Sequence, residues 1–260
     1  MIGFLLKKTL YDLWDNMFRI VVLNLGFVVL TALPVFLPAL AANFFDSIFL
    51  EMALSALGIL LCSVYLSAAA HLVKSVSDYS SFTFGGLFRV LKPALPAGIV
   101  MGLFVFLLYL IAAVILPFYL SIESVFGLIL SAVVFWATFF GLLSFQFYFT
   151  AYVRLGSKAI KSIRKCMVIS LDNSGFSLFL FLHNIVVLLI SIIFVFLFPG
   201  PAGVLLYLDE ALRLRLLKYD WLEANPGADR RKIPWDTLLI EEREKTGVRT
   251  FKNFIFPWKD

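Results

Sequence analysis

The feature that most constrains this chain is an apolar run near its N-terminus that contains no charged residue. It extends from Ile20 to Ala42, directly after Arg19. At about 1.5 Å per residue a helix of this length reaches about 34 Å, and the hydrocarbon core of a bilayer is roughly 30 Å thick. The run therefore predicts a membrane-spanning helix, whose far half should bend at Pro34 and Pro38 against neighbouring helices.

Composition agrees with a membrane protein and excludes a soluble domain. Of the 260 residues, 62% are hydrophobic and 15% are charged, and the mean hydropathy is +0.96. Soluble proteins carry roughly 25% charged residues. A cleaved secretory signal is the alternative for the first run, because Ala39-Leu40-Ala41 is a small-residue site. The run is longer than a signal peptide uses, so we expect it to remain in the mature chain.

Apolar segments of spanning length recur along the chain, and a shorter one follows the Pro199-Gly200-Pro201 break. The sequence therefore predicts an all-α, polytopic transmembrane helical bundle with five full spans plus a short sixth membrane helix. We assign residues 1–223 to this transmembrane bundle and residues 224–260 to a cytoplasmic C-terminal tail. The expected spans are residues 20–42, 48–73, 94–116, 125–152 and 176–198, and the sixth helix starts at 202.

Amphipathic segments precede the first span and follow the fourth. Residues 1–17 alternate apolar and polar groups, and residues 158–170 place most of their cations opposite an apolar face. Such interfacial helices lie against anionic headgroups, so the lipid bilayer is an expected partner. Nucleic acid is not, because these cations alternate with apolar residues beside membrane spans. The most basic stretch holds Arg154, Lys158, Lys161, Arg164 and Lys165.

The distribution of cations predicts the orientation. Placing the N-terminus inside puts all 11 Lys and Arg residues of the first 165 positions in the cytoplasm and leaves only carboxylates in the two outer turns. Five spans alone would send the C-terminus outside. Arg213, Arg215 and Lys218 near the end of the sixth helix favour its return, so we expect both termini in the cytoplasm.

Residues suited to catalysis or metal binding are sparse. His71 and His183 are the only histidines, and neither has an acidic residue close to it in sequence. Cys62 and Cys166 do not form a metal-binding pair, and no metalloprotease, phosphate-loop or nucleophile-elbow motif occurs. We therefore expect no enzymatic activity, no metal site and no cofactor.

Four polar residues should lie at one depth in the membrane. Counted inward from the cytoplasmic ends of their helices, Asn24, Gln146, His183 and Asn184 fall roughly 8 to 12 Å deep. We call them the intramembrane polar level. One interpretation is a polar pocket or gate, because such groups usually face an interior or cavity. The other is hydrogen bonding between helices, at about 1 kcal/mol per bond.

The C-terminal tail is rich in aromatic residues beside lysines. We expect these rings to dock onto the inner face of the bundle, onto the lipid interface or onto a partner, because burying rings leaves the ammonium groups in water. The alternative is a tail that simply folds back on the cytoplasmic loops. The docking residues are Trp235, Phe251, Phe254, Phe256 and Trp258.

Polar and proline residues recur around the apolar spans in an arrangement typical of one family. They are Trp14-Asp15-Asn16, Asn24, Leu33-Pro34, Pro38-Ala39-Leu40-Ala41-Ala42, the loop from Phe82 to Phe88, and Lys158-Ala159 leading to Asn173. With this pattern, residues 5–217 resemble the YesL-like bacterial integral membrane proteins. The resemblance implies a multi-pass protein of the bacterial cytoplasmic (inner) membrane, in a context of carbohydrate uptake, with no catalytic residues to carry over. The segment from about 224 and the acidic pair Asp209-Glu210 depart from that pattern.

The function we expect is that of an integral inner-membrane protein without enzymatic activity. It would act as an accessory or regulatory partner of solute transport, carbohydrate being one such solute, or of envelope processes. Its protein partner would lie in the membrane or the cytoplasm. The alternative is a small solute transporter that uses the intramembrane polar level as its passage. A third class is a membrane enzyme whose site is assembled from residues distant in sequence.

Overall fold

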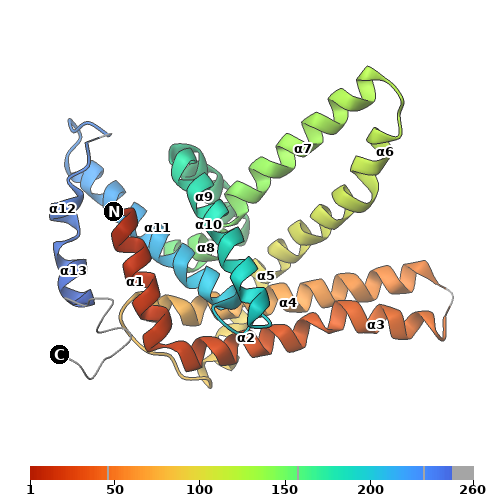
Figure 1. The fold of residues 1–260 in the computed structure, drawn as a ribbon, viewed down its shortest axis with the longest axis horizontal. Helices are drawn as coiled ribbons and strands as arrows, with labels where there is room; N and C mark the ends of the chain where they lie inside the picture. Colours follow the sequence, from red (N-terminus) through yellow and green to blue (C-terminus); the bar gives the residue numbers. More distant parts are fainter. Residues whose placement is uncertain (46, 157, 231, 248–260) are drawn as a thin grey trace.

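The computed structural model describes residues 1–45, 47–156, 158–230 and 232–247, and the regular elements in these ranges are all helical (Figure 1). The all-α prediction is therefore confirmed. The elements are α1 Ile2–Asp15, α2 Met17–Thr31, α3 Leu33–Ala42, α4 Ile48–Ser77, α5 Gly86–Leu110, the π-helical turn η1 Ile111–Ile115, α6 Leu116–Leu120, α7 Val125–Phe145, α8 Tyr148–Leu155, α9 Ala159–Asp172, α10 Ser174–Ile193, α11 Gly200–Ala224, α12 Trp235–Leu238 and α13 Ile240–Thr246.

Five helical stretches are long and apolar enough to cross a membrane, so the chain is a multi-pass membrane protein. The third is longer than the predicted span 94–116: it continues through the π-helical turn η1 to Leu120, with Pro117 in the first turn of α6. The five stretches are Met17–Ala42, Ile48–Ser77, Gly86–Leu120, Val125–Leu155 and Ser174–Ile193.

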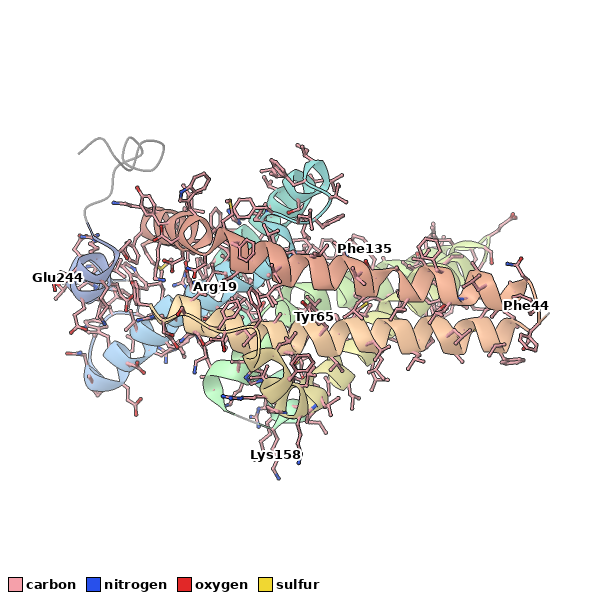
Figure 2. The ribbon with its side chains drawn as sticks, turned by 90° about the horizontal axis from the view of Figure 1, so that it is seen from below. Arg19, Phe44, Tyr65, Phe135, Lys158 and Glu244 are labelled. Carbon is pink, nitrogen blue, oxygen red and sulfur yellow. The ribbon has the colours of Figure 1, made fainter. Side chains whose placement is uncertain are left out.

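Two long helical hairpins give the molecule its shape. One pairs α2 and α3 with α4, and the other pairs α5 and α6 with α7; both project away from the end where α1, α12 and α13 gather (Figure 1). Figure 2 places Phe44 at the tip of the first hairpin and Glu244 at the opposite end of the molecule. We call the end that holds α1, α12 and α13 the near end, and the end that holds the two hairpin tips the far end.

Small residues hold the two hairpins together. Gly98 and Gly102 of α5 are buried and face Val64 and Leu60 of α4. A Cβ added to Gly98 would collide with the backbone of Val64, so only glycine permits this approach. Because lipid provides no hydrophobic force between helices, such close backbone contact is how they associate in a membrane.

The helices α10 and α11 form a hairpin in which the start of α10 lies beside the C-terminal half of α11. Lys218 Nζ lies 3.3 Å from a carboxylate oxygen of Asp172, the last residue of α9, and the Tyr219 hydroxyl donates to the same oxygen at 2.8 Å. The C-terminal half of α11 has therefore come back to the side on which α10 begins. We call residues 194–199, between these two helices, the α10–α11 corner. The C-terminal end of α11 therefore lies at the near end.

Side-chain burial is concentrated at the near end. Leu5, Phe147, Leu206 and Leu212 are fully buried there, and Leu239 of the C-terminal segment is fully buried with them. Residues 235–247 thus pack back onto the bundle, beyond the predicted domain boundary at 223. The far hairpins instead expose large apolar side chains, such as Phe49 at 83%, as a lipid-facing surface requires.

The return of α11 makes a topology prediction. We expect single cysteines at Ser80, Lys161 and Asp220 to react with a membrane-impermeant maleimide from one side, and a cysteine at Glu123 to react only from the other. The buried Cys62 and Cys166 would first be replaced by alanine. Labelling after detergent lysis controls for intrinsic reactivity, and labelling of position 220 from the same side as 123 would contradict the fold.

Candidate functional site

The most unusual part of the structure is a pair of carboxylates buried in α11. Asp209 and Glu210 are 2% and 1% exposed, among the fully buried Leu206, Ala211 and Leu212. An unpaired carboxylate in such surroundings costs several kcal/mol, so each must find a cation or a donor. The partners come from segments far away in sequence.

Glu210 is held by the N-terminal helix. Lys8 Nζ lies 3.2 Å from one oxygen of Glu210, and the Thr9 hydroxyl donates to the other. The Lys8 ammonium also donates to Asp12 at 2.5 Å and to the carbonyl of Ser77, at the end of α4, at 3.2 Å. A buried lysine with three acceptors thus joins α1, α4 and α11.

Asp209 is held from the opposite side by the end of the fourth span. Arg154 of α8 donates Nε to one oxygen of Asp209 at 2.8 Å and Nη2 to the other at 2.5 Å. This two-point geometry is the strongest form of a guanidinium–carboxylate contact. The same Nη2 also donates to the Ser77 hydroxyl at 2.8 Å and to Asp78 at 3.0 Å.

A third cation extends the pairing to the C-terminal helices. Arg213 Nη1 lies 3.2 Å from Asp78, and Nη2 donates to Glu242 of α13 at 2.6 Å. The Tyr79 hydroxyl donates to Glu242 at 2.8 Å, and the Lys8 ammonium lies 4.3 Å from the centre of the Tyr79 ring. The C-terminal segment is therefore tied into the same set of ion pairs as the N-terminal helix.

We call these eight charged residues the buried charge cluster; seven are buried or partly buried, and the Asp78 side chain, 39% exposed, lies at its edge. It holds more carboxylates than cations, and burial raises the pKa of the Glu210 carboxyl well above its usual range, although nearby Lys8 opposes the shift. Burial also raises the pKa of Asp209 against the opposing effect of Arg154. The members are Lys8, Asp12, Asp78, Arg154, Asp209, Glu210, Arg213 and Glu242.

Asn24, the first residue of the intramembrane polar level, does not meet the other three. It is fully buried and its amide nitrogen donates to the carbonyls of Leu197 and Pro199 at 3.0 and 2.7 Å. Its amide oxygen accepts the backbone N–H of Ala202 at 2.8 Å, so Asn24 caps the start of α11 from another helix. Gly200 makes this possible, because a Cβ there would collide with the Asn24 amide.

The structure brings Gln146 and Asn184 together, whereas His183 faces Tyr207. Gln146 breaks the helix between α7 and α8, and its amide nitrogen donates to the Ser177 carbonyl of α10 at 2.9 Å. Its oxygen lies 3.4 Å from the amide nitrogen of Asn184. The His183 ring stacks on Tyr207 of α11 with centroids 4.0 Å apart. Most of these polar groups are thus used in contacts between helices.

Of the aromatic residues proposed to dock the tail, one lies among the described residues. Trp235 begins α12, packs against the buried core and has the Arg215 guanidinium 5.8 Å from its ring centre. Phe251, Phe254, Phe256 and Trp258 lie outside the described residues. Trp235 thus packs against the core of the bundle, and docking by the other four residues stays a prediction.

The buried charge cluster was not among the residues predicted to form a site. A sequence signal for it exists, since Asp209-Glu210 interrupts an apolar helix and such a pair requires cations. The sequence does not indicate which cations pair with these carboxylates, because Lys8 and Arg154 resemble ordinary interfacial residues. In the described parts of the chain, no group of three or more His, Cys, Asp or Glu residues is arranged to hold a metal ion.

Comparison of the whole chain with protein-family models, with curated protein sequences and with solved structures gives no match. The function must therefore be argued from the charges, the burial and the contacts of the chain itself.

The pairing of Lys8 with Glu210 can be tested by a double-mutant cycle. We expect Lys8→Met to lower the free energy of unfolding by about 3 kcal/mol or more, because it leaves the buried Glu210 without a cation. Glu210→Met should lower it by less, because Lys8 keeps Asp12 as a partner. The free energy of unfolding of the double variant should fall by much less than the sum of the losses in the two single variants. Unfolding in detergent measures the three values, and exposed Lys7→Met is the matched control; strictly additive losses would contradict direct pairing.

The raised pKa of Glu210 predicts a dependence of stability on pH. Because the folded state holds this proton more tightly than the unfolded state, stability should fall as pH rises from about 4.5 towards the raised folded-state pKa. Glu210→Gln should flatten this slope. The melting temperature in detergent across that pH range measures it, with Asp236→Asn, an exposed carboxylate at 94%, as control. An unchanged slope in Glu210→Gln would show that other groups cause the dependence.

Proposed function

We propose that the protein is a non-enzymatic membrane protein that serves as an accessory or regulatory partner of solute transport or of envelope processes. The observation that carries this proposal is the buried charge cluster, which joins α1, the ends of α4 and α8, the middle of α11 and the C-terminal α13. Ion pairs with several hydrogen bonds each fix these segments in one arrangement. A fixed polar structure at the membrane surface suits the binding of another protein.

The surface of α12 and α13 provides groups that a partner can contact. Asp236 and Glu241 are 94% and 85% exposed in their side chains, and Arg243 and Lys245 are half exposed beside them. Exposed pairs of this kind contribute little to stability, about 0 to 1 kcal/mol each. Their opposite signs can instead set the orientation of a charged partner, as complementary charges do at protein interfaces.

The intramembrane polar level supports the same proposal. A solute passage needs polar groups that face a cavity, whereas the amides of Asn24 and Gln146 are bonded to the backbone of neighbouring helices. We therefore interpret them as contacts that hold α2, α7 and α10 in place. Membership of the YesL-like family, the bacterial cytoplasmic membrane and a cytoplasmic N-terminus form part of this proposal and rest on sequence motifs and cation asymmetry.

One observation favours the transporter as the second candidate. The Nδ1 atom of His183, the amide oxygen of Asn184 and the Tyr207 hydroxyl are buried without a hydrogen-bond partner among the described residues. Buried groups of this kind usually have partners, so water or a solute would satisfy them in a transporter. Gln146 lies beside Asn184, and Glu210 lies one helical turn after Tyr207 in α11.

Uptake measurements separate the two candidates. We expect proteoliposomes that contain the pure protein to take up sugars and amino acids no faster than protein-free liposomes, because the accessory role needs another protein. A solute-specific flux that is lost in His183→Leu and Gln146→Leu would contradict the proposal and establish the transporter. The exposed Leu182→Ala, beside His183 on the lipid-facing side of α10, is the matched control.

A further inference from the structure

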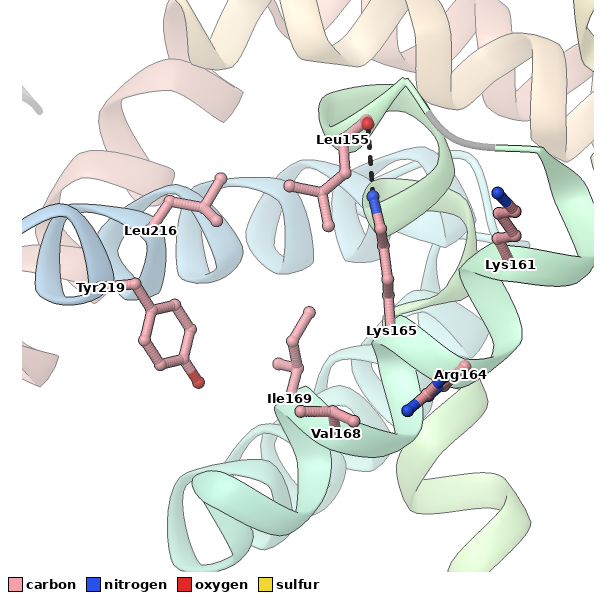
Figure 3. A pocket seen from close by; sticks show the side chains of 8 residues that line it. All are labelled: Leu155, Lys161, Arg164, Lys165, Val168, Ile169, Leu216 and Tyr219. Carbon is pink, nitrogen blue, oxygen red and sulfur yellow. Dashed lines mark hydrogen bonds between the residues drawn. The ribbon is translucent and has the colours of Figure 1, made fainter. Parts of the chain in front are cut away.

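A cavity of about 560 Å³ opens between the end of α8, one face of α9 and the C-terminal half of α11 (Figure 3). Its walls are apolar and are made by Leu155, Val168, Ile169 and Leu216, with the ring of Tyr219 at one end. Its volume lies in the range of sites that hold small ligands, about 300 to 1,000 Å³. None of these walls belongs to the buried charge cluster.

The other lining residues are three cations on α9. Lys161 and Arg164 are exposed and Lys165 is half-buried, with its ammonium 3.5 Å from the Leu155 carbonyl (Figure 3). No carboxylate lines this cavity. Among the described residues these three have no ion pair, whereas Arg154, Arg213 and Lys218 all do. The rim therefore keeps its positive charge available for a ligand.

The cavity lies where a membrane surface would be. Leu155 is the last residue of the fourth apolar stretch, and α9 follows it as an amphipathic helix whose apolar face holds the buried Cys166 and Ile169. An amphipathic helix with cations on its polar face lies at the boundary between acyl chains and headgroups. An apolar slot with a cationic rim at this depth matches a molecule that has an acyl chain and an anionic head.

We propose that this cavity is a binding site for a single anionic phospholipid, whose phosphate is held by Lys161, Arg164 and Lys165 and whose acyl chain lies against Val168, Ile169 and Leu216. Each cation near a charged membrane surface contributes attraction to an anionic lipid. The apolar walls then distinguish a lipid from free phosphate, because only a lipid fills them.

Native mass spectrometry of the full chain in mild detergent tests the site. The probes are phosphatidylglycerol and phosphatidylcholine, added separately and in competition. We expect the wild type to retain phosphatidylglycerol preferentially, and the triple variant Lys161→Gln, Arg164→Gln, Lys165→Gln to lose at least about tenfold of that preference. The matched control neutralises three exposed cations of the same end, Lys7, Arg89 and Lys92, and should retain it.

A second variant fills the slot without changing charge. Val168→Trp should reduce phosphatidylglycerol binding, and glycerol phosphate without acyl chains should not displace the bound lipid from the wild type. Loss of preference in the control as large as in the triple variant would overturn the proposal in favour of non-specific attraction. Unchanged preference in the triple variant, together with unchanged phosphatidylglycerol binding in Val168→Trp, would overturn the proposal as well.

Discussion

The structure depends on the free-energy cost of burying a charged group among apolar side chains. Asp209 and Glu210 in α11 cannot remain ionised among leucines without cations. Arg154 pairs with Asp209, and Lys8 pairs with Glu210. Lys8 fixes α1 against α11, and Arg154 fixes α8 against it. The end of α4 then fits between them, because the Ser77 carbonyl and hydroxyl accept from Lys8 and Arg154. The arrangement of the near end follows from these few contacts.

The two ends of the molecule are stabilised by different physical means. At the far end, helices associate through small residues and expose their large side chains to lipid. At the near end, large side chains are buried and the polar groups bond one another, as in a soluble protein. Asn24 lies between these regions and fixes the α10–α11 corner to the first span through three hydrogen bonds. It therefore couples the membrane-embedded part to the near-end structure.

The sequence predicted the elements better than their contacts. Length and hydropathy locate the apolar helices, because a bilayer requires about 20 apolar residues whatever the tertiary structure. The spacing of Gly98 and Gly102 is a similar local signal. The common depth of Asn24 and Gln146 was estimated from distance along each helix, but depth does not say which helices are neighbours. Likewise, nothing local in the sequence pairs Lys8 with Glu210 or Arg213 with Glu242. Those choices depend on tertiary packing.

The distance along the chain between bonded groups has a consequence for biosynthesis. Lys8 and Glu210 are 202 positions apart, and Asn24 meets Leu197 after 173 positions. While the chain is being made, Lys8 has Asp12 beside it but not yet Glu210, and the partners of Asn24 do not yet exist. Every nascent chain that ends before residue 197 keeps the Asn24 amide without these partners in or beside the bilayer, where an unsatisfied polar group is costly. Only synthesis through Glu210 completes both contacts, so an interrupted chain exposes polar groups that the finished chain has paired.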